Sequence, residues 1–209
     1  MKQGRLITLE GGEGVGKTTN LEFIREYLTA RGIEVVLTRE PGGVPLAEDL
    51  RKFILAQQRL LPEAELLLMF SARVHHLREK ILPALSYGQW VISDRFTDAS
   101  YAYQGGGRGI DWQRIEYLED WLLQGFRPDL TLLFDAPVEV GLARARSRGD
   151  TNRFEDEERS FMERVRKAYL QRWRKEPDRI RKLDATLPLE QVQDSIASLL
   201  DEMIVTWQR

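Results

Sequence analysis

The stretch that decides the fold of this 209-residue chain is Leu9-Glu10-Gly11-Gly12-Glu13-Gly14-Val15-Gly16-Lys17-Thr18. Its last eight residues are a complete G-x-x-x-x-G-K-[ST] phosphate-binding loop. An apolar run over residues 5–10 predicts a buried strand before the loop, and helical spacing over 18–31 predicts a helix after it. Glycines allow the backbone N–H groups to point inward around a phosphate at the helix N-terminus. We expect Lys17 to reach the β- and γ-phosphates of a nucleotide and the Thr18 hydroxyl to ligate Mg²⁺.

Strand-like and helix-like segments alternate along the rest of the chain. Four more strands are predicted, at residues 33–38, 89–94, 130–135 and 178–184. Helices are predicted at 46–56, 62–87, 96–104, 111–124, 138–148, 159–175 and 188–207, with a glycine loop at 105–109. This pattern predicts an α/β fold: one P-loop NTPase domain over residues 1–209, with a five-stranded parallel sheet flanked by helices on both faces. Ligands of such sheets bind at the carboxyl ends of the strands.

Composition narrows the possible partners. The net charge of −2 gives no general attraction to nucleic acids or anionic membranes. The chain has no cysteine, which excludes disulfides, thiolate catalysis and cysteine-ligated metals. No apolar stretch approaches membrane-spanning length, and the N-terminus lacks a signal-peptide pattern. We therefore expect a cytoplasmic protein without a nucleic-acid or membrane partner.

Charged residues at two predicted strand ends are candidates for the site. Asp94-Arg95 ends the third strand, where Asp94 could hold Mg²⁺ through water and Arg95 could bind a phosphate in a bidentate manner. An ordinary strand-end ion pair is the alternative. Arg39 and Arg51 flank the loop after the second strand and the helix that follows, and they could bind a second phosphate; taken alone, each is more often a solvated surface arginine.

Two further groups suggest a nucleotide site. Phe70 and Arg73 share one helix face, so the ring could stack on a nucleobase while the guanidinium donates to a base carbonyl; core packing is the alternative for Phe70. Four arginines surround a polar segment at about 147–158 and could form a lid over a transferring phosphoryl group, or a solvated face: Arg144, Arg146, Arg148 and Arg153.

Together these blocks resemble the bacterial type of thymidylate kinase, over nearly the whole chain. The matching blocks, in order, are residues 9–19, Thr38-Arg39-Glu40-Pro41-Gly42-Gly43, Asp94-Arg95-Phe96 with Ala102-Tyr103-Gln104-Gly105, Asp135-Ala136-Pro137 with Gly141-Leu142-Ala143-Arg144, and Arg153-Phe154-Glu155. The resemblance implies transfer of the γ-phosphoryl group of ATP to dTMP, with Mg²⁺ as cofactor, and a homodimer. It also implies that the lid supplies a catalytic cation, because the phosphate loop contains no arginine.

The resemblance assigns roles to individual residues. Glu13 would approach the 3′-hydroxyl of dTMP, and the acceptor phosphate would be surrounded by Arg39, Arg51 and Arg95. The base would be held by Phe70, Arg73, Ser100 and Gln104. Tyr103 would exclude a ribose 2′-hydroxyl, and Arg153 would be the lid arginine that acts with Lys17 and Arg95 in catalysis.

Two other kinds of protein carry the same phosphate loop. A deoxynucleoside kinase activates an uncharged hydroxyl and usually needs a carboxylate base, whereas the many arginines here favour a phosphorylated acceptor. A GTPase-type switch would be expected to carry an N-K-x-D guanine motif, which the sequence lacks.

Overall fold

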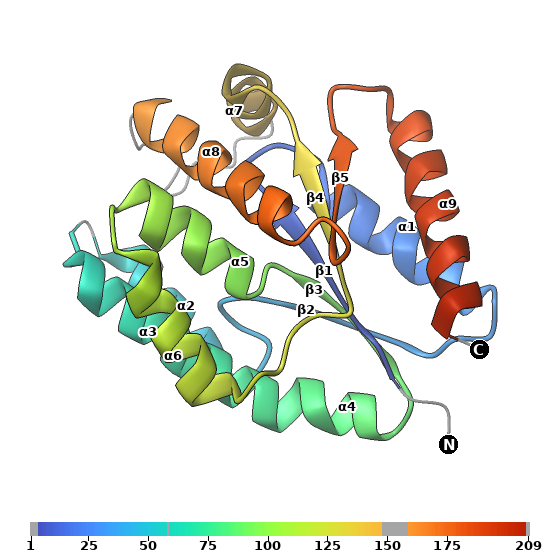
Figure 1. The fold of residues 1–209 in the computed structure, drawn as a ribbon, viewed down its shortest axis with the longest axis horizontal. Helices are drawn as coiled ribbons and strands as arrows, with labels where there is room; N and C mark the ends of the chain where they lie inside the picture. Colours follow the sequence, from blue (N-terminus) through green and yellow to red (C-terminus); the bar gives the residue numbers. More distant parts are fainter. Residues whose placement is uncertain (1–3, 58, 148–158, 208–209) are drawn as a thin grey trace.

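A five-stranded, all-parallel sheet forms the centre of the molecule (Figure 1). The computed structural model describes residues 4–57, 59–147 and 159–207. The strand order is β2-β3-β1-β4-β5. The strands are β1 (Leu6–Gly11), β2 (Val35–Arg39), β3 (Trp90–Asp94), β4 (Leu130–Asp135) and β5 (Ile180–Asp184). The predicted fold class is confirmed, and the middle strand is the one that leads into the phosphate loop.

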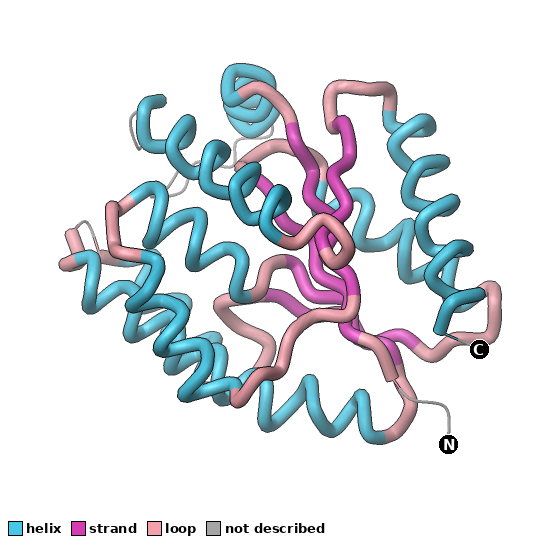
Figure 2. Tube along the Cα trace, in the orientation of Figure 1, coloured by secondary structure: helices cyan, strands magenta, loops and turns pink. Residues whose placement is uncertain are grey.

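Helices cover both faces of this sheet (Figure 2). On one face α1 (Lys17–Thr29) and α9 (Leu189–Trp207) pack over the strands, with Ile24, Leu28 and Ile196 in the shared core. The other helices are α2 (Pro45–Ala56), α3 (Pro62–His76), α4 (Leu82–Ser86), α5 (Thr97–Ser100), α6 (Trp112–Leu123), α7 (Val138–Ser147) and α8 (Arg159–Lys175). Because both faces are covered, the three central strands β3, β1 and β4 are almost continuously buried, as parallel strands usually are. No helix in the described ranges is long and apolar enough to cross a membrane.

Local sequence signals explain where the helices begin. Pro45 and Pro62 stand at the first turns of α2 and α3, where a missing N–H costs nothing. Asp111 caps α6, because its side chain accepts a hydrogen bond from the N–H of Gln113 at 2.9 Å. These caps match the helix starts that the sequence predicts.

The long helical region predicted at 62–87 contains a π-helical turn, η1 (Leu77–Ile81), between α3 and α4. Pro83 follows immediately, in the first turn of α4. Proline inside an α-helix removes one hydrogen bond and clashes with the carbonyl four residues earlier. A wider π-turn just before it relieves that conflict and lets the helix continue.

The glycine run is not the loop that its composition suggests. Gly105 to Gly107 belong to a second π-helical segment, η2 (Tyr101–Gly107), which packs along α8. A Cβ atom on Gly106 would lie 2.5 Å from the Cβ of Ala168, and one on Gly107 would lie 2.6 Å from the ring of Phe161. The glycines therefore permit a close approach between two helical segments, which composition alone could not distinguish from a flexible turn.

Candidate active site

The phosphate loop joins β1 to α1 at the carboxyl edge of the sheet. Gly14 and Gly16 have positive φ angles of 69° and 91°, which glycine adopts without strain. The Lys17 ammonium folds back over the loop and donates to the carbonyls of Gly11 at 3.2 Å and Gly12 at 2.7 Å. Burial and the nearby Arg95 lower the pKa of Lys17. The loop therefore places a buried cation against its own glycine-rich backbone, a combination that suits a phosphate site.

Helix α7 is in direct contact with this loop. A Cβ atom on Gly141 would collide with the carbonyl oxygen of Glu13, and one on Gly14 would collide with the carbonyl oxygen of Gly141. Glycine at both positions allows the two backbones to touch. Gly141 belongs to the block Gly141-Leu142-Ala143-Arg144, but the sequence of that block does not reveal that α7 contacts the phosphate loop.

Arg95 is held in an unusual backbone conformation directly after β3. Its φ angle is 72°, in the left-handed region that non-glycine residues rarely occupy. Three hydrogen bonds fix the turn: Arg95 N–H to Leu9 O at 3.0 Å, Ser93 Oγ to Arg95 O at 2.7 Å, and Phe96 N–H to Glu10 Oε1 at 2.7 Å. Such strain persists where neighbouring contacts enforce it, and it is concentrated at functional sites.

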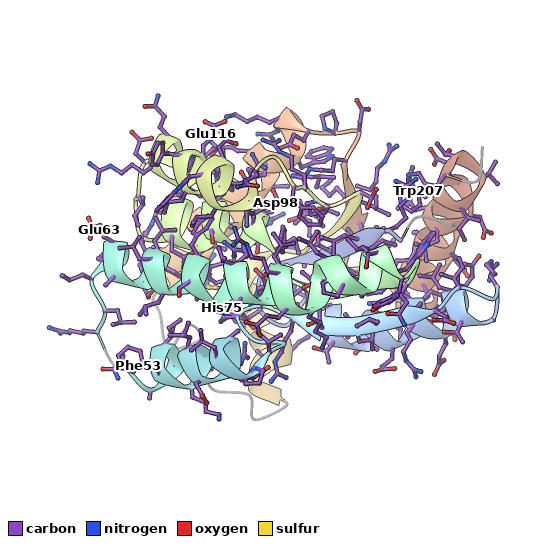
Figure 3. All side chains as sticks on the ribbon, turned by 90° about the horizontal axis from the view of Figure 1, so that it is seen from below. Phe53, Glu63, His75, Asp98, Glu116 and Trp207 are labelled. Carbon is purple, nitrogen blue, oxygen red and sulfur yellow. The ribbon has the colours of Figure 1, made fainter. Side chains whose placement is uncertain are left out.

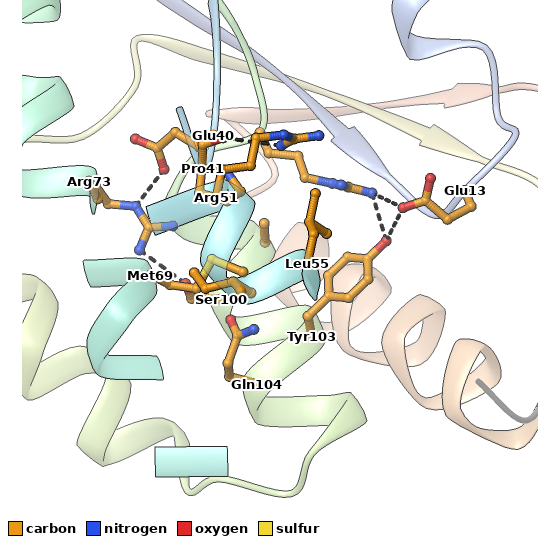
Figure 4. Close-up of a pocket in the computed structure, with 13 residues that line it drawn as sticks. Glu13, Glu40, Pro41, Arg51, Leu55, Met69, Arg73, Ser100, Tyr103 and Gln104 are labelled. Atoms are coloured by element: carbon orange, nitrogen blue, oxygen red, sulfur yellow. Dashed lines mark hydrogen bonds and ion pairs between the residues drawn. The ribbon is translucent and has the colours of Figure 1, made fainter. Parts of the chain in front are cut away.

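The guanidinium of Arg95 meets the phosphate loop at Glu13. Arg95 Nη2 forms a short ion pair with Glu13 Oε1 and also lies 2.8 Å from the Tyr103 hydroxyl, which donates to the same Glu13 oxygen at 3.1 Å (Figure 4). Burial by itself would raise the pKa of Glu13, but Arg95 and Lys17 outweigh it and lower the pKa to about 2. Glu13 is therefore a fixed negative charge between two cations.

A cluster of arginines lies next to this ion pair. Arg51 lines the same cavity and donates to the carbonyl of Pro41 at 3.1 Å. Burial, followed by repulsion from Arg39 and Arg95, lowers the pKa of Arg51, as expected where several guanidinium groups converge. Arg39 lies outside the cavity lining, half exposed, and its Nη2 donates to Glu48 at 2.9 Å. Converging cations of this kind form an anion site.

The opposite end of the cavity is organised by Arg73 (Figure 4). This buried side chain donates to Glu40 Oε2 at 2.7 Å, to Ser100 Oγ at 3.0 Å and to the carbonyl of Phe96 at 3.1 Å. Both Arg73 and Ser100 line the cavity, as their predicted roles require. The contacts fix the plane of the guanidinium.

Phe70 does not line the cavity, whereas its neighbour Met69 does. Phe70 is only 1% exposed and packs in a cluster with Leu66 and Tyr101. The Arg73 guanidinium lies 4.7 Å from the centre of the Phe70 ring. The Phe70 ring therefore packs against the Arg73 guanidinium, and Met69 contributes an apolar side chain to the cavity lining.

Glu40 and His76 were missed in the sequence. Glu40 follows β2, lines the cavity, and accepts from Arg73 with one oxygen while the other lies 3.0 Å from His76 Nδ1. His76 is fully buried, and its Nε2 lies 2.6 Å from Thr38 Oγ1. The position of Glu40 at a strand's carboxyl end was the signal that could have identified it.

The wall beside η2 is tied to the rest of the fold through Asp98. Figure 3 shows this residue inside the molecule, and it is 1% exposed. Its carboxylate accepts from Arg172 on α8 at 2.8 Å and from Arg179 before β5 at 2.8 Å. A buried carboxylate with two arginine partners anchors α5 to α8 and β5.

A second depression lies on the other side of the phosphate loop. Val15 and Asn20 border it from the loop and α1, and Leu187 and Val192 border it from the segment after β5. Arg144 of α7 also borders it and donates to the carbonyl of Ala185 at 2.8 Å. The predicted lid residue Arg153, and the lid segment from residue 148 to 158, lie outside the described residues.

The whole chain matches known proteins of one kind. A family model described as "Thymidylate kinase" matches residues 9–196. The thymidylate kinase of Methylococcus capsulatus is 57% identical over 204 residues, which cover 98% of each chain. The chain belongs to the thymidylate kinase family. A second relative, the thymidylate kinase of Pseudomonas savastanoi pv. phaseolicola, is 53% identical over 96% of this chain and 97% of its own. The crystal structure of the Ehrlichia chaffeensis thymidylate kinase shares its fold, with a TM-score of 0.79 at 32% identity, covering 95% and 99% of the two chains.

The activity expected from the sequence is thereby confirmed. The enzyme phosphorylates dTMP to dTDP and belongs to a kinase family that uses ATP. Membership of this family sets aside both the deoxynucleoside kinase and the GTPase-type switch.

Proposed function

We propose that the enzyme binds the phosphates of ATP in the loop over residues 11–18 and binds dTMP in the cavity between α2, α3 and η2. One observation carries this proposal: Glu13 belongs to the phosphate loop and also lines the cavity. The donor and acceptor sites therefore share a wall. The acceptor phosphate would lie near Arg51 and Arg95, with Arg39 at the rim, and the base would lie between Arg73 and Met69.

Phosphoryl transfer requires little proton chemistry here, because the dTMP phosphate is already a nucleophile. The enzyme must bring two highly charged groups into line and neutralise them. Lys17 and Arg95 both lie near Glu13 and would act on the transferring phosphoryl group, and Arg153 of the lid would close over it. Closure would exclude water as a competing acceptor. Glu13 would keep Arg95 in position and approach the 3′-hydroxyl, and Tyr103 would leave no room for a 2′-hydroxyl.

Asp94 and Thr18 would hold Mg²⁺ together with the ATP phosphates. The Asp94 Oδ1 atom is buried, and it has no hydrogen-bond partner among the described residues. Mg²⁺ usually keeps several waters and takes few protein ligands at phosphate sites. When bound, the ion would neutralise charge on the phosphates. The ATP base would enter the depression bordered by Arg144 and Leu187, which continues from the loop.

We also propose that the enzyme is a homodimer, as its sequence predicts. Exposed apolar side chains lie on α3 and α6: Leu67 is 58% exposed, Tyr117 70% and Trp121 64%. Leu67 and Tyr117 border a common groove between these helices. An exposed apolar patch of this kind is typical of an interface. Sedimentation of Leu67→Glu beside the unmodified enzyme tests it, and an unchanged molecular mass would argue against this face. We further propose that the chain forms a single kinase domain with a lid at about residues 147–158. We also propose that the enzyme acts in the cytoplasm.

Two variants test the assignment of the two sites. Calorimetric titration of Arg51→Ala should show dTMP affinity reduced roughly 10- to 100-fold, because a charge-assisted hydrogen bond to phosphate is lost, with ATP affinity little changed. Lys17→Ala should show the reverse pattern. The site assignment fails if both variants weaken binding of the same nucleotide.

A further inference from the structure

A buried hydrogen bond lies directly behind the cavity wall. Gln104 Nε2, on η2, donates to Glu65 Oε1, on α3, at 2.9 Å. Glu65 is fully buried, and its second oxygen lies 3.5 Å from Arg108 Nη2. Gln104 itself lines the cavity beside Arg73 and Ser100, so this hydrogen bond connects a buried carboxylate to the surface that a ligand meets.

The chemistry of the pair fixes the orientation of the Gln104 amide. A carboxylate has only acceptor atoms, and Glu65 is paired with the Arg108 guanidinium. The amide nitrogen of Gln104 must therefore face Glu65, which turns its carbonyl oxygen away. Within the described residues, that Oε1 atom accepts no hydrogen bond. Gln104 thus presents an acceptor, rather than a donor, to a molecule in the cavity.

Arg73 supplies hydrogen-bond donors beside the acceptor of Gln104. Its guanidinium lines the cavity and carries only donors. The imide edge of thymine offers an acceptor at O4 and a donor at N3–H. Cytosine offers the opposite pair, an amino donor at C4 and an acceptor at N3.

We propose that Glu65 is a positioning residue for base selection: it locks the Gln104 amide so that Oε1 accepts from N3–H of thymine. The proposal rests on the assignment of this cavity to the dTMP base. With the Gln104 amide held in this orientation, its Oε1 atom would face N3 of cytosine, and both atoms are hydrogen-bond acceptors. If the amide could turn over, Nε2 would suit the cytosine N3 atom. Glu65 therefore acts against the wrong base without touching it.

The decisive variant is Glu65→Gln, which keeps the size of the side chain but adds donor atoms, so that Gln104 can turn over. We expect the ratio of kcat/KM for dTMP over dCMP to fall about tenfold or more, since a mispaired buried group typically changes binding on this scale. The change should appear in KM, with kcat for dTMP little altered, because the base lies far from the reacting phosphates. Glu65→Asp, which withdraws the carboxylate by one methylene, should shift the ratio in the same direction if Glu65→Gln does not fold.

A matched control is available in α6. Glu119 is also buried and accepts from the Tyr101 hydroxyl at 2.6 Å, but it is not among the cavity-lining residues, and the hydrogen-bond partner of the Gln104 amide is Glu65. Glu119→Gln makes the same chemical change, so it should leave the dTMP-to-dCMP ratio unchanged. An unchanged ratio in folded Glu65→Gln, or an equal fall in Glu119→Gln, would overturn the proposal.

A third variant separates this proposal from the site assignment beneath it. Gln104→Leu removes the acceptor and should raise KM for dTMP. If it does not, Gln104 does not meet the base and the assignment of the cavity fails. If Gln104→Leu raises KM while Glu65→Gln keeps full selectivity, the cavity assignment stands and only the positioning role of Glu65 is wrong.

Discussion

Replacement of Glu13 by glutamine should lower the stability of the enzyme in a pH-dependent way. The carboxylate of Glu13 forms a short ion pair with Arg95 and accepts from the Tyr103 hydroxyl. Arg95 and Lys17 overcome the effect of burial and bring its pKa from the usual 4.5 to about 2. A carboxyl group with a lowered folded-state pKa stabilises the fold above its unfolded pKa, and this contribution declines as the pH falls toward the folded pKa.

The magnitude follows from that difference. Each pH unit between the folded and unfolded pKa is worth about 1.36 kcal/mol, so the ionised carboxylate contributes about 3 kcal/mol at pH 7. At pH 3.5 about 1.4 kcal/mol of this contribution is lost. Glu13→Gln should therefore unfold about 3 kcal/mol more easily at pH 7, and this deficit should shrink to about 2 kcal/mol at pH 3.5.

Urea unfolding of the two proteins at several pH values between 7 and 3.5 measures this directly. Glu22→Gln is the control, because Glu22 pairs with Arg25 at 2.7 Å on an exposed face, and exposed pairs contribute at most about 1 kcal/mol. The reasoning is refuted if the deficit of Glu13→Gln is below about 1 kcal/mol at pH 7, or if it does not depend on pH. A reduced kcat/KM for dTMP should accompany the loss of stability, because Arg95 loses the partner that holds it.

Four further predictions concern catalysis and choice of acceptor. Lys17→Ala should abolish turnover and leave the circular dichroism spectrum unchanged, because its ammonium acts on the nucleotide phosphates; near-normal turnover would contradict the role of the loop. Arg153→Ala should reduce kcat on the order of 10³-fold and change KM for dTMP little, whereas a rise in KM alone would make Arg153 a binding contact. With dTMP, dUMP and dCMP as acceptors, kcat/KM should fall in that order, because Arg73 can donate to O4 but cannot accept from an amino group; equal use of dCMP would exclude Arg73 as the base reader. Gly141→Ala should raise KM for ATP, because the new methyl group collides with the Glu13 carbonyl, and unchanged kinetics would show that α7 can move away from the loop.

The fold could be read from the sequence because its signals are local. Strands β1, β3 and β4 are short apolar runs, and helices α2, α3 and α6 begin at a proline or at a capping aspartate. The phosphate-loop motif indicated which strand leads into the nucleotide-binding loop. The π-helical turns at Leu77–Ile81 and Tyr101–Gly107 could not be read, since they depend on a proline and on a neighbouring helix rather than on composition.

The site was predictable at its cationic end and less so at its base-binding end. A motif identifies Lys17, a strand end identifies Arg95, and Arg51 stands in the helix after the second strand; the structure brings all three close to Glu13. Helical spacing placed Phe70 and Arg73 on a common face, which is true of them, but spacing cannot say which adjacent residue turns toward a cavity. Met69 lines the cavity instead, because Phe70 is taken up by the packing beneath Arg73.

The proposed base-binding end of the cavity and its proposed phosphate end are organised in the same way. In both places a buried carboxylate fixes a group that faces the ligand: Glu13 holds Arg95, Glu40 holds Arg73, and Glu65 holds the Gln104 amide. A long arginine or glutamine side chain loses considerable rotamer freedom when it orders, and a charged partner makes that ordering part of folding rather than of binding. The ligand then meets groups already in place. Glu13 and Glu40 belong to sequence blocks that resemble thymidylate kinases, whereas Glu65 lies outside these blocks. A motif alone does not show which carboxylate holds which ligand-facing group, because those contacts join segments far apart in the sequence.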